Sequence, residues 1–168
     1  MKIDLGKNEL IHFVGVGGIG MSGLALIMNG LGYKVQGSDI ANNRNIGRLK
    51  EKKIRIFLDH KKENIKKTTV LVISSAIKKN NPELIEAVKK NLPVYTRGDM
   101  LGHIVSFMRN VVITGSHGKT TTTSLVSSIF TAANLDPTII NGGVLNSIGR
   151  FVSTRRDRLV VFPSDILQ

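Results

Sequence analysis

The sequence contains no cysteine and no tryptophan, and only four of its 168 residues are histidine. Without cysteine the chain cannot form disulfide bonds or thiolate zinc sites, and the spacing of His12, His60, His103 and His117 matches no metal-binding pattern. The chain also lacks an apolar run long enough to span a bilayer, and its start has no signal-peptide pattern. We therefore expect a cytoplasmic protein that neither enters a membrane nor is exported.

Aromatic residues are scarce, whereas positive charge is abundant. The formal net charge of +12 could indicate a nucleic-acid partner, because lysine and arginine neutralise phosphates. However, the lysines occur in short runs mixed with glutamate and asparagine, and only two tyrosines and six phenylalanines are available to stack on bases. We favour a solvated basic surface and expect no nucleic-acid partner. Nothing in the sequence predicts a protein partner.

Short apolar runs alternate with segments of helical period, which indicates an α/β fold around a parallel sheet. The run at residues 69–73 is apolar in its middle and is expected to be a central strand. Asp99 is expected to cap the helix that follows it. The expected strands lie at residues 10–14, 34–37, 54–57, 69–73, 93–95 and 111–113, and the expected helices at 21–31, 45–53, 82–88, 100–108 and 125–133.

A first glycine loop, GVGGIG at residues 15–20, follows the first expected strand. The pattern G-x-G-x-x-G between a strand and a helix is typical of a site for a nucleotide diphosphate. Gly15 permits a tight turn, Gly17 lets the backbone approach the diphosphate, and Gly20 lets the helix pack on the strand. Asp39 ends the second strand, where a carboxylate can accept from a ribose hydroxyl. These residues alone allow NAD or another nucleoside diphosphate, or glycines that serve only close packing.

A second glycine loop, GSHGKTT at residues 115–121, follows the last expected strand. It resembles the phosphate-binding pattern G-x-x-x-x-G-K-[ST], but its first glycine comes two residues late, so the loop is shorter. Lys119 can reach β- and γ-phosphate oxygens, and Thr120 can coordinate Mg²⁺. His117 could contribute its side chain or only its backbone N–H.

Three further positions carry weaker expectations. The polar residues 74–76 follow an apolar strand at the end where parallel sheets bind ligands, although ordinary turn chemistry would explain them equally well. His12 lies inside a strand and is expected to be a packed core residue. Arg97 could pair with a substrate phosphate or only with Asp99.

Several segments, taken in their order, resemble the Mur ligase family. They are IHFVGVGGIGMSGLA (11–25), GSD (37–39), VISSAIKKNNPEL (72–84), RGDML (97–101), ITGSHGKTTTTSLV (113–126) and NGG (141–143). The resemblance covers roughly residues 8–147 and is more specific than either glycine loop. It implies an ATP-dependent, ADP-forming ligase of peptidoglycan precursor synthesis. Such an enzyme joins L-alanine to UDP-N-acetylmuramate through an acyl phosphate.

The resemblance implies that the first loop binds the UDP-sugar and the second binds ATP. The residues implied at the UDP-sugar are Gly15, Gly17, Gly18, Gly20, Asp39, Ser74, Ser75 and Ala76. The residues implied at ATP are Gly115, Ser116, His117, Gly118, Lys119, Thr120 and Thr121. Lys119 and Thr120 are the implied catalytic residues, because Lys119 neutralises the transferring phosphoryl group and Thr120 helps to hold Mg²⁺.

We expect a Rossmann-like UDP-sugar domain with a parallel sheet at residues 1–106 and the truncated start of a P-loop ATPase-type α/β domain at 107–147. The tail at 148–168 departs from the family: it has four arginines and no glutamate, and Asp157 and Asp165 are its only carboxylates. It is typical of a frameshift, a truncated reading frame or a fragment that ends in foreign sequence. We expect ligand binding without turnover. The alternatives are an NAD-binding oxidoreductase or sensor module, and a remnant without function.

Overall fold

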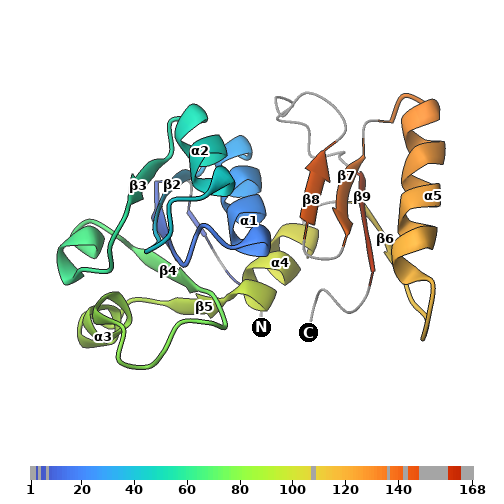
Figure 1. Ribbon diagram of the computed structural model, residues 1–168. Helices are drawn as coiled ribbons and strands as arrows, with labels where there is room; N and C mark the ends of the chain where they lie inside the picture. Colours follow the sequence, from blue (N-terminus) through green and yellow to red (C-terminus); the bar gives the residue numbers. More distant parts are fainter. Residues whose placement is uncertain are drawn as a thin grey trace. The chain divides into compact units, whose positions relative to one another are not determined.

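The computed structural model describes residues 3, 5, 6, 8–106, 109–135, 137–141, 144–147 and 159–163. The chain forms two compact units, Met1–Met100 and Leu101–Gln168. Within the described residues no helix is both long enough and apolar enough to cross a membrane. Each unit is built around its own sheet (Figure 1).

The first unit contains a five-stranded sheet in which every pairing is parallel, as expected for an α/β fold. The strand order is β3-β2-β1-β4-β5, so β1 is the central strand. Residues 69–73 were expected to form a central strand, and β4 is indeed an interior strand, paired with β1 on one side and β5 on the other. The strands are β1 (Leu10–Val14), β2 (Lys34–Ser38), β3 (Arg55–Phe57), β4 (Val70–Ile73) and β5 (Val94–Thr96).

Helices cover both faces of this sheet, with α1 and α2 on one side and α3 on the other (Figure 1). The short helix η1 packs with α3. The helices are α1 (Ile19–Gly30), α2 (Arg44–Glu51), η1 (Lys62–Ile65), α3 (Pro82–Lys89) and α4 (Arg97–Ser106). Residue alternation along β1 places Ile11 and Phe13 on one face and His12 and Val14 on the other, and all four are fully buried.

Side-chain caps set where three of these helices begin. The Asn43 and Asn81 side chains each accept from two backbone N–H groups in the first turn of α2 and α3. At α4 the cap was expected at Asp99, but the helix begins at Arg97 and Thr96 precedes it. The Thr96 hydroxyl accepts from the Asp99 N–H at 3.2 Å, and the Asp99 carboxylate accepts from the Thr96 N–H at 2.8 Å. This reciprocal pair is a capping box, so Thr96 is the cap.

The second unit contains a four-stranded sheet in the order β6-β9-β7-β8. The β7–β8 pair is antiparallel, and the other pairs are parallel. Its elements are β6 (Arg109–Ile113), α5 (Lys119–Ala132), β7 (Thr138–Asn141), β8 (Val144–Ser147) and β9 (Leu159–Pro163). Strand β9 lies in the segment 148–168, which was expected to be a divergent tail, and it contributes the buried Val160 and Val161.

Helix α5 begins at Lys119, six residues before the expected start. Along its run of serine and threonine residues, several hydroxyls donate to the carbonyl of the preceding turn, so these polar groups are satisfied within the helix. Ser127 Oγ donates to Thr123 O at 2.6 Å, and Thr131 Oγ1 donates to Ser127 O at 2.8 Å. The second glycine loop therefore leads directly into a helix N-terminus.

Replacing Gly37 with alanine is expected to destabilise the first unit by about 1–3 kcal/mol, because the new Cβ would lie 2.8 Å from Phe13 O and from Val16 Cβ. Gly47, inside α2, has no atom within 4 Å of a Cβ position. Gly47→Ala should therefore stabilise the unit by about 0.5–1 kcal/mol through helix propensity. Urea unfolding followed by circular dichroism measures both changes, and a tolerated Gly37→Ala would contradict the packing described.

Candidate functional site

The loops that follow β1, β2 and β4 meet at the carboxyl edge of the first sheet, where open parallel sheets bind ligands. A Cβ on Gly15 would lie 3.1 Å from Ser74 Cβ, and Gly15 has a positive φ of 79° that favours glycine. The Ser74 N–H donates to Val14 O at 3.2 Å. Ser74 is half-buried, whereas Ser75 and Ala76 are exposed. The structure thus brings the loop of residues 74–76 next to the first glycine loop.

The peptide groups of Gly17 are bound by three side chains from the segment that follows β2. Asp39 Oδ2 accepts from the Gly17 N–H at 2.8 Å, and its other oxygen accepts from the Ala41 N–H at 2.9 Å. The Asn43 and Asn45 side chains donate to Gly17 O at 3.1 and 2.9 Å. Sequence reasoning missed both asparagines, although the run ANNRN after Asp39 is unusually rich in amides.

The remaining amides of the first loop are also used internally. Gly15 and Val16 donate to Ser38 O at 2.9 and 3.0 Å, and Gly18 donates to Gly15 O at 3.2 Å. Helix α1 follows, and no side chain caps it. Among the described residues, the N–H groups of residues 19–21 have no hydrogen-bond acceptor. These first-turn amides, with the positive end of the helix dipole, are the donors that the loop offers to an anion.

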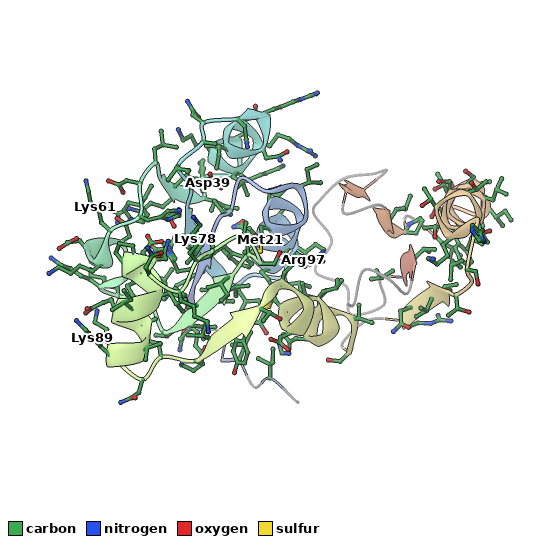
Figure 2. The ribbon with its side chains drawn as sticks, turned by 60° about the horizontal axis from the view of Figure 1, so that its bottom comes forward. Met21, Asp39, Lys61, Lys78, Lys89 and Arg97 are labelled. Atoms are coloured by element: carbon green, nitrogen blue, oxygen red, sulfur yellow. The ribbon has the colours of Figure 1, made fainter. Side chains whose placement is uncertain are left out.

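Arg97 lies against this end of α1. A Cβ on Gly20 would lie 3.1 Å from Arg97 Cδ and 3.3 Å from Arg97 Nη1, so Gly20 makes room for the arginine rather than for a strand. Figure 2 shows Arg97 close to Met21, in the first turn of α1. Within the described part of the chain Arg97 has no ion-pair partner, and Asp99 pairs with Thr96 instead. A half-buried cation therefore sits beside the α1 amides.

The second glycine loop is exposed and lies in the other unit. Gly115 and Gly118 have φ angles of 150° and 77°, which favour glycine at both positions. A Cβ on Gly118 would have no neighbour within 4 Å, so the space next to the start of α5 is open. Lys119 Nζ donates to Gly115 O at 2.9 Å. His117 is exposed, as are Ser116, Thr120 and Thr121.

The loop suits phosphate groups better than a protein-only metal site. Two positive-φ glycines, the open start of α5 and Lys119 form a cradle of the kind that binds phosphates. In the described ranges no three His, Cys, Asp or Glu side chains gather as metal ligands. Thr120 supplies one hydroxyl, and Mg²⁺ commonly combines one or two protein ligands with phosphate oxygens and water. Asp157 and Asp165 lie outside the described residues.

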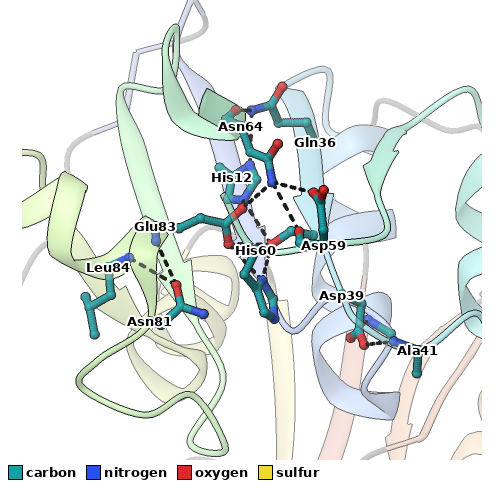
Figure 3. Close-up of polar contacts among 12 residues, drawn as sticks. His12, Gln36, Asp39, Ala41, Asp59, His60, Asn64, Asn81, Glu83 and Leu84 are labelled. Atoms are coloured by element: carbon teal, nitrogen blue, oxygen red, sulfur yellow. Dashed lines mark hydrogen bonds and ion pairs between the residues drawn. The ribbon is translucent and has the colours of Figure 1, made fainter. Parts of the chain in front are cut away.

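A buried polar cluster lies between the sheet and α3, on the face opposite α1 (Figure 3). His12 is fully buried, as expected of a core residue, but its partners were not foreseen. Gln36 Nε2 donates to Asn64 O at 2.8 Å, which identifies that atom as the amide nitrogen, and it also contacts His12 Nδ1 at 3.0 Å. His12 Nδ1 is thus the acceptor, and Nε2 carries the proton toward Glu83.

Glu83 is the acidic centre of this cluster. Burial raises the pKa of its carboxyl, but His12, together with hydrogen bonds from Ser38 and Asn64, outweighs burial and holds the pKa below the ordinary 4.5. The Glu83 side chain is fully buried, and the neighbouring His60 is 16% exposed. Because each of these partners is at least 19 residues from Glu83 in sequence, no local pattern could have revealed the cluster.

Known proteins resemble this chain over most of its length. Residues 10–109 match the profile of the Mur ligase family, catalytic domain. The UDP-N-acetylmuramate--L-alanine ligase of Pelagibacter ubique is 68% identical over 148 residues, which are 88% of this chain and 32% of that ligase. The ligase of the same name from Brucella ovis is 54% identical over 149 residues, which are 89% of this chain and 31% of that ligase.

A solved structure gives the same result. The crystal structure of the UDP-N-acetylmuramate-alanine ligase MurC from Thermotoga maritima is 30% identical to this chain, with a TM-score of 0.73. The match covers 90% of this chain and 36% of that one. The chain thus spans about a third of the length of the curated relatives it matches. These matches do not support the NAD-binding alternative.

Gly17→Ala is expected to destabilise the first unit by about 1–3 kcal/mol, since its Cβ would lie 2.9 Å from Asp39 Oδ2 and 3.1 Å from Asn43 Nδ2. Gly18 is the matched control: its φ of −61° and ψ of 146° suit any residue, and its nearest neighbour would be at 3.4 Å. Gly18→Ala should change stability by less than about 0.5 kcal/mol. Equal effects in urea unfolding would refute the assigned role of Gly17.

Acid should destabilise the first unit through Glu83. Because the folded-state pKa of Glu83 is lowered, its stabilisation is complete above about pH 4.5 and is lost as the pH falls through the folded value. Thermal unfolding measured from pH 7 down to about pH 3 should show this loss, and Glu83→Gln should reduce the slope below pH 4.5. Glu86→Gln, which removes a half-buried carboxylate that pairs only with Lys90 among the described residues, should keep the wild-type slope.

Proposed function

This chain belongs to the Mur ligase family, and from that premise we propose that its first unit binds the UDP group of UDP-N-acetylmuramate. The site is the carboxyl edge of the first sheet, at residues 15–20, Asp39 and residues 74–76. The ligases to which this chain is similar are named for the same sugar nucleotide. The proposal assigns the diphosphate, the most highly charged part of the ligand, to the start of α1.

One observation carries this assignment: the Arg97 guanidinium lies beside the α1 amides of residues 19–21, which have no acceptor among the described residues. Amides at a helix start and an adjacent arginine together provide donors and positive charge to a diphosphate. The sequence suggested that Gly17 lets the backbone approach the diphosphate, but its N–H already donates to Asp39. Asp39 thus supports the loop, and any contact with the ribose would use its remaining lone pairs.

We further propose that the second unit binds ATP through residues 115–121. Lys119 would exchange the Gly115 carbonyl for β- and γ-phosphate oxygens, and the Thr120 hydroxyl would help to hold Mg²⁺. Bound Mg²⁺ supplies neutralisation of the phosphate charge. The exposure of this loop and the open space beside Gly118 support the assignment.

The two sites together fit the ligation named in the relatives. A carboxylate is a poor electrophile until its oxygen becomes part of a leaving group, and phosphoryl transfer from ATP provides that group. The α-amine of L-alanine then attacks the acyl phosphate, giving the amide and releasing phosphate. In this scheme the chain holds the sugar nucleotide and the ATP phosphates in the cytoplasmic synthesis of a peptidoglycan precursor. Lys119 stabilises the charge that develops on the transferring phosphoryl group.

Isothermal titration tests the first site. The full chain should bind UDP-N-acetylmuramate, and NAD should not compete. Arg97→Gln should weaken binding by about tenfold or more, because a charge-assisted contact to the diphosphate is lost. Lys89→Gln removes an equal charge from the exposed end of α3, well away from Arg97 in Figure 2, and should leave the affinity unchanged.

Two outcomes would count against the proposed site. Binding of NAD without the sugar nucleotide would contradict the assigned ligand. An equal loss of affinity in Arg97→Gln and Lys89→Gln would indicate that overall charge, rather than the contact at α1, attracts the ligand.

A further inference from the structure

Four polar side chains from different parts of the first unit converge on the Glu83 carboxylate (Figure 3). Oε2 accepts from Ser38 Oγ at 2.6 Å and contacts His60 Nδ1 at 3.0 Å. Oε1 accepts from Asn64 Nδ2 at 2.7 Å and faces His12 Nε2 at 3.4 Å. A carboxylate offers about four lone-pair sites, and these four contacts face both of its oxygens.

Of these four side chains' residues, Ser38 also contacts the first glycine loop. Its hydroxyl donates to Glu83, while its carbonyl accepts from the N–H groups of Gly15 and Val16. The next residue, Asp39, accepts from the Gly17 N–H. Residues 38 and 39 therefore connect a buried carboxylate on α3 with three successive amides of the loop, through hydrogen bonds on either side.

We propose that Glu83 is a positioning residue for the sugar-nucleotide site: through Ser38 it holds residues 15–17 in the conformation that presents the start of α1 to the ligand. This inference rests on the function proposed above. Glu83 itself makes no contact with the ligand in this scheme, because its side chain is fully buried beneath the sheet. Its role is to fix the end of β2, from which the loop is held.

A carboxylate is needed at this position, and an amide of the same shape cannot replace it. Glutamine would present one oxygen and one NH₂ group, so two of the four converging side chains would face a donor. The Ser38 hydroxyl makes the shortest of the four contacts, and its orientation depends most directly on a good acceptor. Loss of that acceptor frees the end of β2 to move.

Site-resolved amide hydrogen exchange on the full chain, with and without UDP-N-acetylmuramate, tests the inference. The reference is the N–H of Leu71 in β4, which donates to Pro93 O and reports overall opening of the unit. In Glu83→Gln, the Gly15 and Val16 amides should exchange at least about tenfold faster relative to this reference. The affinity for UDP-N-acetylmuramate should fall by about tenfold, the equivalent of one charge-assisted hydrogen bond.

Leu84→Ala is the matched control, because Leu84 is the neighbour of Glu83 on α3. Its side chain makes no hydrogen bond and packs against the apolar cluster of Val14, Ile65, Leu71 and Ala87. It should lower overall stability and leave the ratio of Gly15 to Leu71 exchange at the wild-type value. Ser38→Ala keeps the carbonyl and removes the bond to Glu83. It should therefore reproduce the faster loop exchange, and it carries the test if Glu83→Gln does not fold.

The outcomes separate this inference from the proposed function. If the wild-type chain binds the sugar nucleotide and neither Glu83→Gln nor Ser38→Ala changes the exchange ratio, the positioning role is wrong and the proposed function stands. If the wild-type chain does not bind the sugar nucleotide, the proposed function fails, while the exchange rates still decide whether Glu83 holds the loop. If Leu84→Ala changed the ratio of Gly15 to Leu71 exchange as much as Glu83→Gln does, Glu83 would only stabilise the unit in general, and the positioning role would be wrong.

Discussion

A carboxylate that is removed from water must be surrounded by donors, and this requirement organises the first unit around Glu83. The donors come from β1, β2, the segment after β3, and η1, and the carboxylate comes from α3. Each of these elements must hold its position for the charge to be satisfied. The face of the sheet opposite α1 is therefore fixed by a polar network as well as by apolar packing. The network also fixes the end of β2 at the carboxyl edge of the sheet, because Ser38 belongs to it.

The first glycine loop satisfies its own amides before any ligand arrives. The N–H groups of residues 15–18 all donate within the protein, to Ser38, Asp39 and Gly15. Glycine at position 17 is required because Asp39 and Asn43 would be too close to a Cβ. At Gly17 the pattern G-x-G-x-x-G therefore follows from packing within the protein, without a ligand. This explains why the pattern alone could not distinguish one nucleotide from another. In the proposed function, the start of α1 and Arg97 supply the contacts to the diphosphate.

Strands β1–β6 and helices α1–α5 could be predicted from their hydrophobic period, because that signal is local, whereas β7, β8, β9 and η1 were not expected. The order of the strands could not be predicted, since it depends on where the chain crosses the sheet after β3. Asp99 was misjudged as the cap because Thr96 and Asp99 form a reciprocal pair, of which either member suits the pattern. Glu83 gave no signal, because a glutamate in the first turn of a helix is ordinarily exposed, and its partners are far away in sequence.

In the proposed function, the two glycine loops differ in how much they must change to bind phosphate. In the first, side chains hold the backbone at Gly17, and the N–H groups of residues 19–21 have no acceptor among the described residues, so binding would require little rearrangement. In the second, Lys119 Nζ donates to the Gly115 carbonyl and must leave it to reach a phosphate. That exchange replaces a neutral acceptor with a charged one, which makes a stronger hydrogen bond. A fixed site suits a group that is only held, whereas a lysine that changes partner suits the group that is transferred.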